Sequence, residues 1–445
     1  MQNQANLKCI IPKCGKEYPI SSTKIKCECG NLLDVNYKHS LSPNLKEIFY
    51  ERRNPQGSIF NESGVWRFRE LINFCGIDVE DLEQCSKNLV SLDGAEGRQS
   101  KPYHMSKVAN FIGIENERLM LQPEGYNPSG SFKDNGMSTA VTHAKMVGAK
   151  KIICASTGNT SASAGMYAAN ENMECDVYIP DGEIAPGKLS QAYQFGTQLI
   201  KIKGNFDDAF LRSLEAADEP GSYTVNSVNP FRIEGQKTIL YRVLEFLNWE
   251  VPDWIVYPGG ALGNTSSCGK AIMELYQWGW IKKIPRIAVV NATGANTLDV
   301  LYNGKFEGVE LRWNKGNPDI ELIERYYSKM QKDGMRPKTK ATAIQIGKPV
   351  NLLKGLRALE FTNGVVLSVE DKEMLDGMSV VGLNGFDCEM ASGAVPAGIK
   401  KLLDEDIIKN DDKIAGILTG RQKEPLLPIN YHNDESNRFA RPPKA

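Results

Sequence analysis

From about residue 100 onward, short apolar runs alternate with longer segments in which apolar positions recur every three or four residues. This alternation of strand and amphipathic helix is typical of parallel α/β sheets with helices on both faces. The pattern predicts strands over 150–156, 175–180, 197–202, 253–258 and 285–292, and helices over 161–170, 185–196, 205–218, 234–249 and 266–279. Residues 45–95 and 303–340 follow neither period clearly. Ligands of such sheets bind beyond the carboxyl ends of the strands, so the loops after the strands are the expected ligand sites.

The composition is that of an ordinary soluble protein. The 445 residues are 41% hydrophobic and 24% charged, and the net charge is −1. This length allows two or three domains, and the balanced charge gives no overall attraction for nucleic acid or an anionic membrane. No run of about eighteen apolar residues occurs, the N-terminus lacks the apolar core of a signal peptide, and the ten cysteines are scattered. We therefore expect a cytoplasmic protein with no nucleic-acid or membrane partner.

The first forty residues form a distinct segment that contains Cys9, Cys14, Cys27 and Cys29. Their spacing, C-x4-C-x12-C-x-C, gives two close pairs, which suits a tetrahedral thiolate site for Zn²⁺. Reduced structural cysteines are the alternative. The segment has six lysines against three acids, but it lacks the interleaved arginines and aromatics of a nucleic-acid-binding ribbon. We predict that this segment stabilises the fold and does not bind nucleic acid.

Lys133 lies in a small, hydroxyl-rich loop that reads NPSGSFK over 127–133. Further along, a predicted strand ends in Ser156, and Asn159 and Thr160 follow at the start of a helix. A lysine near a helix start rich in hydroxyl and N–H groups can hold a carbonyl compound as a Schiff base while the helix start binds an anion. The alternative is a surface lysine in a turn.

Two further loops offer anion-binding chemistry. The strand 253–258 runs into PGGALGNT at 258–265, where glycines let backbone N–H groups approach a phosphate; a tight turn is the alternative. The loop 226–232 reads NSVNPFR and offers an amide, a hydroxyl and a guanidinium for a second tetrahedral anion. Alternatively, its polar residues cap the next helix and Arg232 pairs with an acid such as Glu234.

These motifs, together with TAIQIGKPV at 342–350 and ILTG at 417–420, resemble the threonine synthases in order and spacing. That family belongs to the fold-type II pyridoxal-phosphate enzymes, as do tryptophan synthase β, cysteine synthase and the serine/threonine dehydratases. The resemblance covers about residues 90–425, and the cysteine cluster is similar to one that many members carry. The segment 226–232 separates threonine synthases from the wider group, because their substrate bears its own phosphate.

The resemblance implies an α/β fold with two parallel-sheet domains, the cofactor in the cleft between them, and a small N-terminal Cys-rich ribbon. The expected ribbon covers 1–40, and a smaller α/β domain over 107–223 carries the Schiff-base lysine and the asparagine loop. Residues 41–106 and 224–445 would form the large cofactor-binding domain.

The resemblance also implies residue roles. Lys133 would hold pyridoxal 5'-phosphate as a Schiff base and then act as base and acid. Asn159 would hydrogen-bond the phenolic oxygen of the cofactor, and Thr419 would meet its pyridine nitrogen, where a hydroxyl does not enforce protonation. The expected ligands of the cofactor phosphate are Gly260, Ala261, Leu262, Gly263 and Asn264. The expected substrate-binding residues are Ser156, Thr160, Asn226, Ser227 and Arg232, the last three as ligands of the substrate phosphate.

The implied reaction is the last step of threonine biosynthesis, which converts O-phospho-L-homoserine and water to L-threonine and phosphate by γ-elimination and β-addition of water. The resemblance further implies a homodimer, while the cysteine spacing suggests a structural zinc. A cysteate synthase acting on phosphoserine, a dehydratase, or a non-catalytic regulatory protein on the same fold are the alternatives. A dehydratase substrate has no phosphate for Arg232.

Three positions depart from the family pattern. Residues 96–103 read EGRQSKPY where a motif like EGxTPL is usual, Ala261 stands where many relatives have asparagine, and Arg421 stands where histidine is frequent.

Overall fold

The computed structural model describes residues 5–38, 41–53, 57–181, 191, 193–204, 206–424 and 426–441. The chain forms two compact units. Unit 1 consists of Met1–Gln99, Asn127–Glu245 and Gln277–Trp280, and unit 2 of Ser100–Tyr126, Phe246–Tyr276 and Ile281–Ala445.

These units divide the chain at different residues from the expected domains. Residues 41–99 and 224–245 lie in unit 1, whereas the sequence-based boundaries group them with the large cofactor-binding domain. Buried polar contacts explain the difference, because Arg67 Nη2 lies 2.9 Å from Glu245 Oε2 and Arg242 Nη1 donates to the Gly64 carbonyl at 2.8 Å. The functional meaning given to each expected domain stays a prediction.

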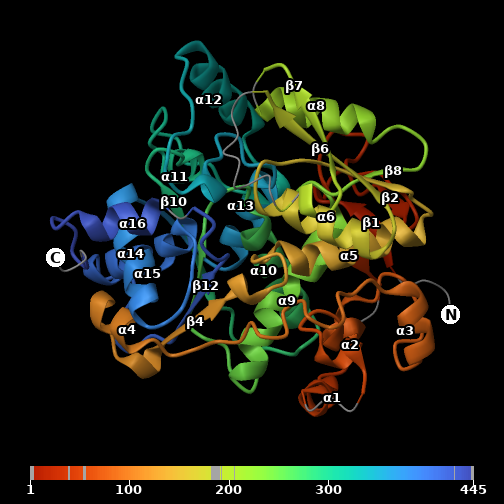
Figure 1. Cartoon of the computed structure of the whole chain (residues 1–445), viewed down its shortest axis with the longest axis horizontal. Coiled ribbons are helices and arrows are strands. Elements are labelled where there is room, and N and C mark those ends of the chain that lie inside the picture. Colours follow the sequence, from red (N-terminus) through yellow and green to blue (C-terminus); the bar gives the residue numbers. More distant parts are fainter. Residues whose placement is uncertain are drawn as a thin grey trace. The chain divides into compact units, whose positions relative to one another are not determined.

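Unit 1 is built around a parallel sheet in the order β7-β6-β5-β8 (Figure 1). Its apolar core combines buried residues of these strands and of α5 and α6, including Val141, Ile152 and Tyr167. The elements of this sheet and its helices are α5 (Lys133–Met146), β5 (Lys151–Ala155), α6 (Asn159–Asn170), β6 (Glu174–Pro180), β7 (Gln198–Ile202), α8 (Phe206–Ala216), β8 (Ser222–Thr224) and α9 (Pro230–Phe246).

A second, antiparallel sheet at the N-terminus of unit 1 contains β1 (Ala5–Cys9), β2 (Glu17–Pro19) and β3 (Leu33–Tyr37) in the order β2-β1-β3. We call residues 5–37 the N-terminal sheet. Cys9 pairs with Leu33 and Ala5 with Tyr37 in the register of β1 and β3. The paired strands β1 and β3 therefore carry Cys9 at one end and Tyr37 at the other.

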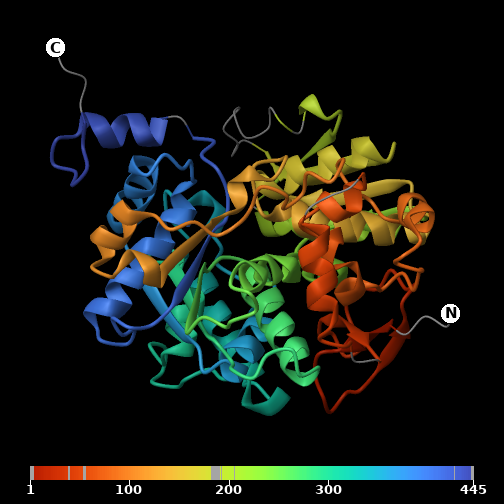
Figure 2. The same ribbon diagram turned by 90° about the horizontal axis from the view of Figure 1, so that it is seen from below.

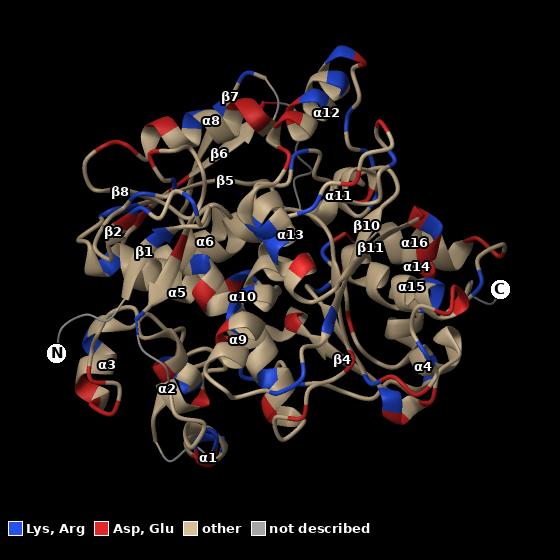
Figure 3. Ribbon diagram, turned by 180° about the vertical axis from the view of Figure 1, so that it is seen from behind, with Lys and Arg blue, Asp and Glu red and all other residues tan. Residues whose placement is uncertain are grey.

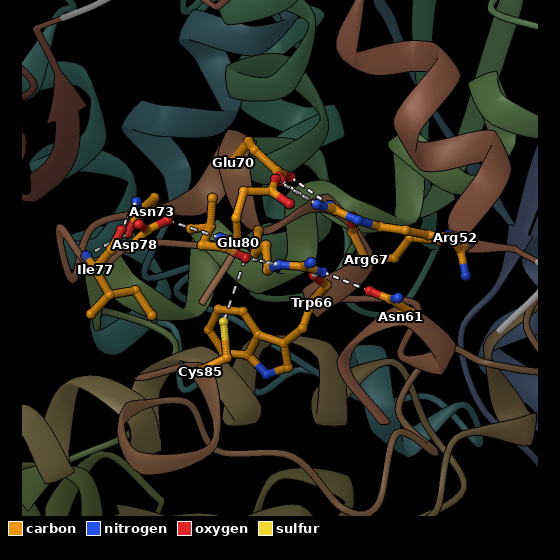
Figure 4. Close-up of polar contacts among 12 residues, drawn as sticks. Arg52, Asn61, Trp66, Arg67, Glu70, Asn73, Ile77, Asp78, Glu80 and Cys85 are labelled. Atoms are coloured by element: carbon orange, nitrogen blue, oxygen red, sulfur yellow. Dashed lines mark hydrogen bonds and ion pairs between the residues drawn. The ribbon is translucent and has the colours of Figure 1, made fainter. Parts of the chain in front are cut away.

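The segment without a clear period, residues 45–95, forms short helices joined by turns. These are α1 (Leu45–Arg52), α2 (Ile59–Glu62), the 3₁₀ segment η1 (Trp66–Ile72) and α3 (Leu82–Asn88). Figure 4 shows the ion pairs that join them, in which Arg52 meets Glu70 at 2.6 Å and Glu80 at 3.1 Å. Arg52 and Glu70 are buried together with apolar residues such as Phe49 and Phe68. The helices that carry them have eight residues or fewer, so no period is long enough to reveal them.

Unit 2 contains a five-stranded parallel sheet in the order β11-β10-β9-β12-β4. Helix α15 packs against β9, β10, β11 and β12, and α14 packs beside α15 (Figure 2). The strands are β4 (Leu119–Pro123), β9 (Trp254–Pro258), β10 (Arg286–Ala292), β11 (Val365–Val369) and β12 (Ile414–Leu418). The helices are α4 (Ser106–Ile112), α10 (Gly263–Gln277), α11 (Thr297–Tyr302), α12 (Ile320–Lys332), α13 (Leu352–Phe361), α14 (Asp371–Leu383), α15 (Met390–Asp404) and α16 (Leu426–Asn433), with short 3₁₀ turns η2 (Asn116–Arg118), η3 (Glu124–Tyr126), η4 (Asn314–Gly316) and η5 (Thr342–Ile344).

The five predicted strands correspond to β5, β6, β7, β9 and β10, and four of the five predicted helices correspond to α6, α8, α9 and α10. The fifth, 185–196, lies mostly outside the described residues. Helix α9 begins earlier than predicted, at Pro230, because proline is favoured in the first turn of a helix. Helix α12 was not predicted at all, although Asp319 caps it by accepting from Leu322 N–H at 2.8 Å.

Lysine, arginine and the acids are distributed over the elements of both units (Figure 3). Within the described part of the chain, no helix combines the length and the apolar character that crossing a membrane requires.

Candidate active site

In unit 1, Lys133 is the first residue of α5 and is half-buried, with Nζ 4.0 Å from the centre of the Phe132 ring. The loop before it is held by Asp134. The Asp134 carboxylate accepts from Ser129 N–H at 2.7 Å, from the Ser129 hydroxyl at 2.5 Å and from the Ser163 hydroxyl at 2.6 Å. Because Ser163 belongs to α6, one buried carboxylate fixes both the lysine loop and the next helix.

The second hydroxyl-rich loop opens α6, a helix of 12 residues. Ser156 Oγ accepts from Gly158 N–H at 3.2 Å, and Asn159 is the first helical residue. Thr160 follows and is buried. The N–H groups of a first helical turn have no intrahelical partners and the helix dipole favours negative charge, so this start can receive an anion.

Arg232 lies in the first turn of α9 with its side chain 1% exposed. Its Nη1 donates to the Val225 carbonyl at 3.1 Å, while Nε and Nη2 have no hydrogen-bond partner among the described residues. The acid suggested as its partner, Glu234, pairs with Lys237 at 2.7 Å instead. Burial lowers the pKa of Arg232 to about 10, against an opposite effect of Cys154, so the side chain is charged at neutral pH. A buried cation with unpaired N–H groups is costly unless an anion meets it.

The other polar residues of this loop are Asn226, Ser227 and Asn229. The Asn226 amide pairs with the Ala155 backbone, accepting from N–H at 3.0 Å and donating to the carbonyl at 2.9 Å. Asn226 thereby fixes the loop beside the end of β5 and keeps one amide hydrogen for a ligand. Ser227 is half-buried. Asn229 accepts from Phe231 N–H at 2.9 Å, so it caps the helix, which is the alternative role expected for polar residues of this loop.

In unit 2, the glycine-rich turn between β9 and α10 has no room for side chains at its start. A Cβ on Gly259 would lie 2.4 Å from Asn291 Nδ2, and a Cβ on Gly260 would lie 3.1 Å from Ile344 Cα. Leu262 adopts a φ of 63°, which turns the backbone sharply into α10. Such a turn presents backbone N–H groups at a helix start.

The first turn of α10 also holds polar atoms without partners. Asn264 Oδ1 and Thr265 Oγ1 are buried, and neither has a hydrogen-bond partner within the described residues. The Thr265 hydroxyl can donate, and the helix start supplies N–H groups. No acid occurs in 258–265. This donor set fits a phosphate group.

Thr419 follows β12 and is buried. Its Oγ1 donates to Glu389 Oε1 at 3.1 Å, and Ser392 Oγ lies 3.3 Å away. A Cβ on Gly420 would lie 2.8 Å from Glu389 Oε1, so the glycine permits the close approach of the acid. In this contact the hydroxyl hydrogen of Thr419 points to Glu389, and the hydroxyl oxygen can still accept from a donor.

The four N-terminal cysteines converge. Their sulfur atoms all lie within 4.8 Å of one another, with Cys9–Cys29 and Cys14–Cys27 each at 3.6 Å. A tetrahedral site with zinc–sulfur bonds of about 2.3 Å places the sulfurs roughly 3.8 Å apart. The cluster is therefore compatible with a zinc ion.

Residues 96–103, which differ from the family motif, begin next to the loop that carries Lys133. The buried Glu96 carboxylate accepts from the hydroxyls of Ser63 and Ser91, both at 2.7 Å, and Gly97 N–H donates to Asn127 Oδ1 at 2.8 Å. Burial raises the pKa of Glu96, although the two hydroxyl donors oppose this effect. The glutamate and glycine of this segment support the loop that carries Lys133.

The sequence did not single out Asp134 or Glu389. Asp134 had an available signal, because an acid directly after the lysine of a hydroxyl-rich loop can accept from that loop. Glu389 had none, since it lies 30 residues before Thr419 along the chain.

A family model described as pyridoxal-phosphate dependent enzyme matches residues 102–420. The chain belongs to this family. Among solved structures, a fungal L-serine ammonia-lyase from Rhizomucor miehei superposes with a TM-score of 0.58 at 19% identity, covering 74% of this chain and 96% of that one. A diaminopropionate ammonia lyase from Escherichia coli gives 0.58 at 14% identity, covering 77% and 89%. At these identities the likeness shows the fold alone, which is fold-type II as predicted.

Curated relatives show to which group within this family the chain belongs. Threonine synthase from Methanocaldococcus jannaschii is 37% identical over 422 residues, which cover 94% of this chain and 93% of the relative. Threonine synthase from Methanosarcina acetivorans is 33% identical over 428 residues, covering 95% and 93%. These relatives place the chain among the threonine synthases of the pyridoxal-phosphate family.

Proposed function

We propose that this protein uses pyridoxal 5'-phosphate to convert O-phospho-L-homoserine and water to L-threonine and phosphate. The relatives named threonine synthase support the reaction. The observation that supports a phosphorylated substrate is the buried Arg232 guanidinium, in which Nε and Nη2 lack a hydrogen-bond partner in the described chain. A dehydratase substrate bears no phosphate and would leave this charge unmatched, whereas a phosphate ester neutralises it.

Several residues would hold the cofactor. We assign Lys133 to its aldehyde carbon, Asn159 to its phenolic oxygen and Thr419 to its ring nitrogen. When bound, the cofactor withdraws electrons from the carbons next to the substrate nitrogen. The ligands assigned to its phosphate are Gly260, Ala261, Leu262, Gly263 and Asn264.

Lys133 Nζ would move the protons of the reaction. As a neutral amine it removes a proton from the α-carbon and one from the β-carbon, and a proton returns to the γ-carbon when phosphate leaves. Water then adds its oxygen at the β-carbon and gives up a proton, a proton returns to the α-carbon, and the released phosphate takes up the third proton. Arg232, with Asn226 and Ser227, holds the phosphate as substrate and stabilises it as leaving group. Ser156 and Thr160 would bind the substrate carboxylate or phosphate at the start of α6.

The cysteine cluster belongs to the same proposal. Cys9, Cys14, Cys27 and Cys29 would hold one zinc ion, supported by the sulfur–sulfur distances. The family resemblance supports a cytoplasmic homodimer that acts on a small-molecule substrate, without nucleic acid or membrane.

Replacing Arg232 tests the assignment of the substrate phosphate. Arg232→Ala should lower kcat/KM for O-phospho-L-homoserine by about a hundredfold or more, because loss of a charged, buried contact costs roughly 3 kcal/mol or more. The visible absorbance of bound cofactor should remain. Arg212→Ala, on the exposed face of α8, is the matched control. Undiminished turnover in Arg232→Ala would remove Arg232 from the site.

A further inference from the structure

The N-terminal sheet touches the helix that carries Arg232 through a buried charge pair. The Tyr37 hydroxyl donates to Glu234 Oε2 at 2.7 Å. Glu234 also pairs with Lys237 at 2.7 Å, and both charged side chains are fully buried. Lys237 Nζ lies 4.9 Å from the centre of the Tyr37 ring. One tyrosine at the end of β3 therefore contacts both members of the pair.

This contact constrains α9 because buried charges need their partners. A buried carboxylate that loses one hydrogen-bond donor bears a desolvation cost, so the position of Glu234 relative to Tyr37 is restricted. Glu234 follows Arg232 by two residues and thus projects from roughly the opposite side of the same helical turn. The turn is held by the N-terminal sheet on one side while Arg232 meets the Val225 carbonyl on the other.

His143 of α5 forms a second connection. Its Nε2 lies 2.7 Å from the Ile20 carbonyl, just after β2, and its Nδ1 lies 2.7 Å from the Tyr223 hydroxyl. Since a carbonyl only accepts, Nε2 carries the hydrogen and Nδ1 accepts from Tyr223. The ring stacks on Phe231, with centres 3.5 Å apart and planes at 12°. Phe231 directly precedes Arg232.

Both connections end on the first turn of α9, and in Figure 1 the red strands of the N-terminal sheet lie beside α5. We propose that the N-terminal sheet is a positioning element for Arg232, which it holds through Tyr37 and Ile20 so as to set the affinity for the substrate phosphate. This inference rests on the proposed function of Arg232. Under this proposal the N-terminal sheet contributes to substrate binding as well as to the stability of the fold.

Tyr37→Phe tests the proposal, because it removes one hydrogen bond and keeps the ring over Lys237. The holoenzyme should show a KM for O-phospho-L-homoserine raised about tenfold, which corresponds to about 1.4 kcal/mol. Its kcat should stay within about twofold, and the cofactor absorbance should be unchanged. Asn36→Ala is the matched control, since Asn36 precedes Tyr37 and donates to Asn6 within the sheet at 3.0 Å. It should lower thermal stability without moving KM.

A second readout needs no turnover. Inorganic phosphate should raise the unfolding temperature of the cofactor-loaded protein, and Tyr37→Phe should shift the required phosphate concentration upward by about the same tenfold factor. In an Arg232→Ala background, Tyr37→Phe should cause no further shift.

The possible failures are distinct. If the wild-type protein releases no phosphate from O-phospho-L-homoserine, the proposed function is wrong. If it turns over the substrate while Tyr37→Phe lowers the unfolding temperature but leaves KM and the phosphate titration unchanged, the N-terminal sheet is only a structural support and the inference is overturned.

Discussion

Burial lowers the pKa of both Arg232 and His143, but the two side chains differ in charge at neutral pH. It lowers the pKa of Arg232 to about 10, above physiological pH, and that of His143 to about 4, below it. The arginine therefore stays charged and requires an anion, whereas the histidine stays neutral and bonds a carbonyl and a hydroxyl. The hydrogen bond to Ile20 opposes the effect of burial on His143 without overcoming it.

The lowered pKa of His143 predicts that the stability of the protein depends on pH. The folded pKa of about 4 lies below the ordinary 6.5, so between these values the unfolded chain binds a proton that the folded protein does not. The stabilisation is present above pH 6.5 and is lost as the pH falls toward 4. Between pH 7 and pH 5 the free energy of unfolding should fall by about 2 kcal/mol more in the wild type than in His143→Gln. Chemical denaturation of both proteins at both pH values measures this difference, and equal losses would contradict it.

Among the elements, α5 and α9 carry Lys133 and Arg232 and meet backbone to backbone. A Cβ on Gly235 would lie 1.9 Å from the Asn135 carbonyl oxygen, and a Cβ on Gly136 would lie 2.7 Å from the Arg232 carbonyl oxygen. Only residues without side chains permit this approach, which fixes the two functional helices relative to each other within unit 1.

Gly235→Ala should therefore destabilise the protein by about 3 kcal/mol, since neither backbone can yield easily. Gly382→Ala in α14 is the matched control, because nothing lies within 4 Å of its added Cβ. The control should be neutral or stabilising by up to about 1 kcal/mol. Thermal unfolding of the two variants measures this difference, and similar midpoints would contradict the close approach of α5 and α9.

Five of the parallel strands and the motif loops could be predicted, because their apolar runs and their glycine or hydroxyl clusters are local features of the sequence. The partners of the motif residues could not. Asn226 binds the Ala155 backbone, 71 residues away, and Glu234 binds Tyr37, 197 residues away. The short helices of 45–95 escaped prediction because each has eight residues or fewer, which is too short for a periodic signal.

At the scale of the whole molecule, the N-terminal sheet is too small to supply a large core of its own. Its buried apolar residues include Leu7, Leu33 and Val35. A bound metal can provide the missing stability in a segment of this size.

The purified protein should contain about one zinc per chain, as measured by elemental analysis. Cys14→Ser should lose the metal and lower the unfolding temperature, whereas Cys75→Ser, outside the cluster, should keep it. A metal-free wild type of unchanged stability after chelation would contradict the assignment.

The reaction of the cofactor-loaded protein with O-phospho-L-homoserine is the most direct test of the central claim. Phosphate and threonine should appear in equal amounts with the wild type, and Lys133→Ala should form neither and lose the visible absorbance of the bound cofactor. O-phospho-L-serine with sulfite should give no cysteate. Cysteate formation from that mixture, without threonine from O-phospho-L-homoserine, would contradict the account.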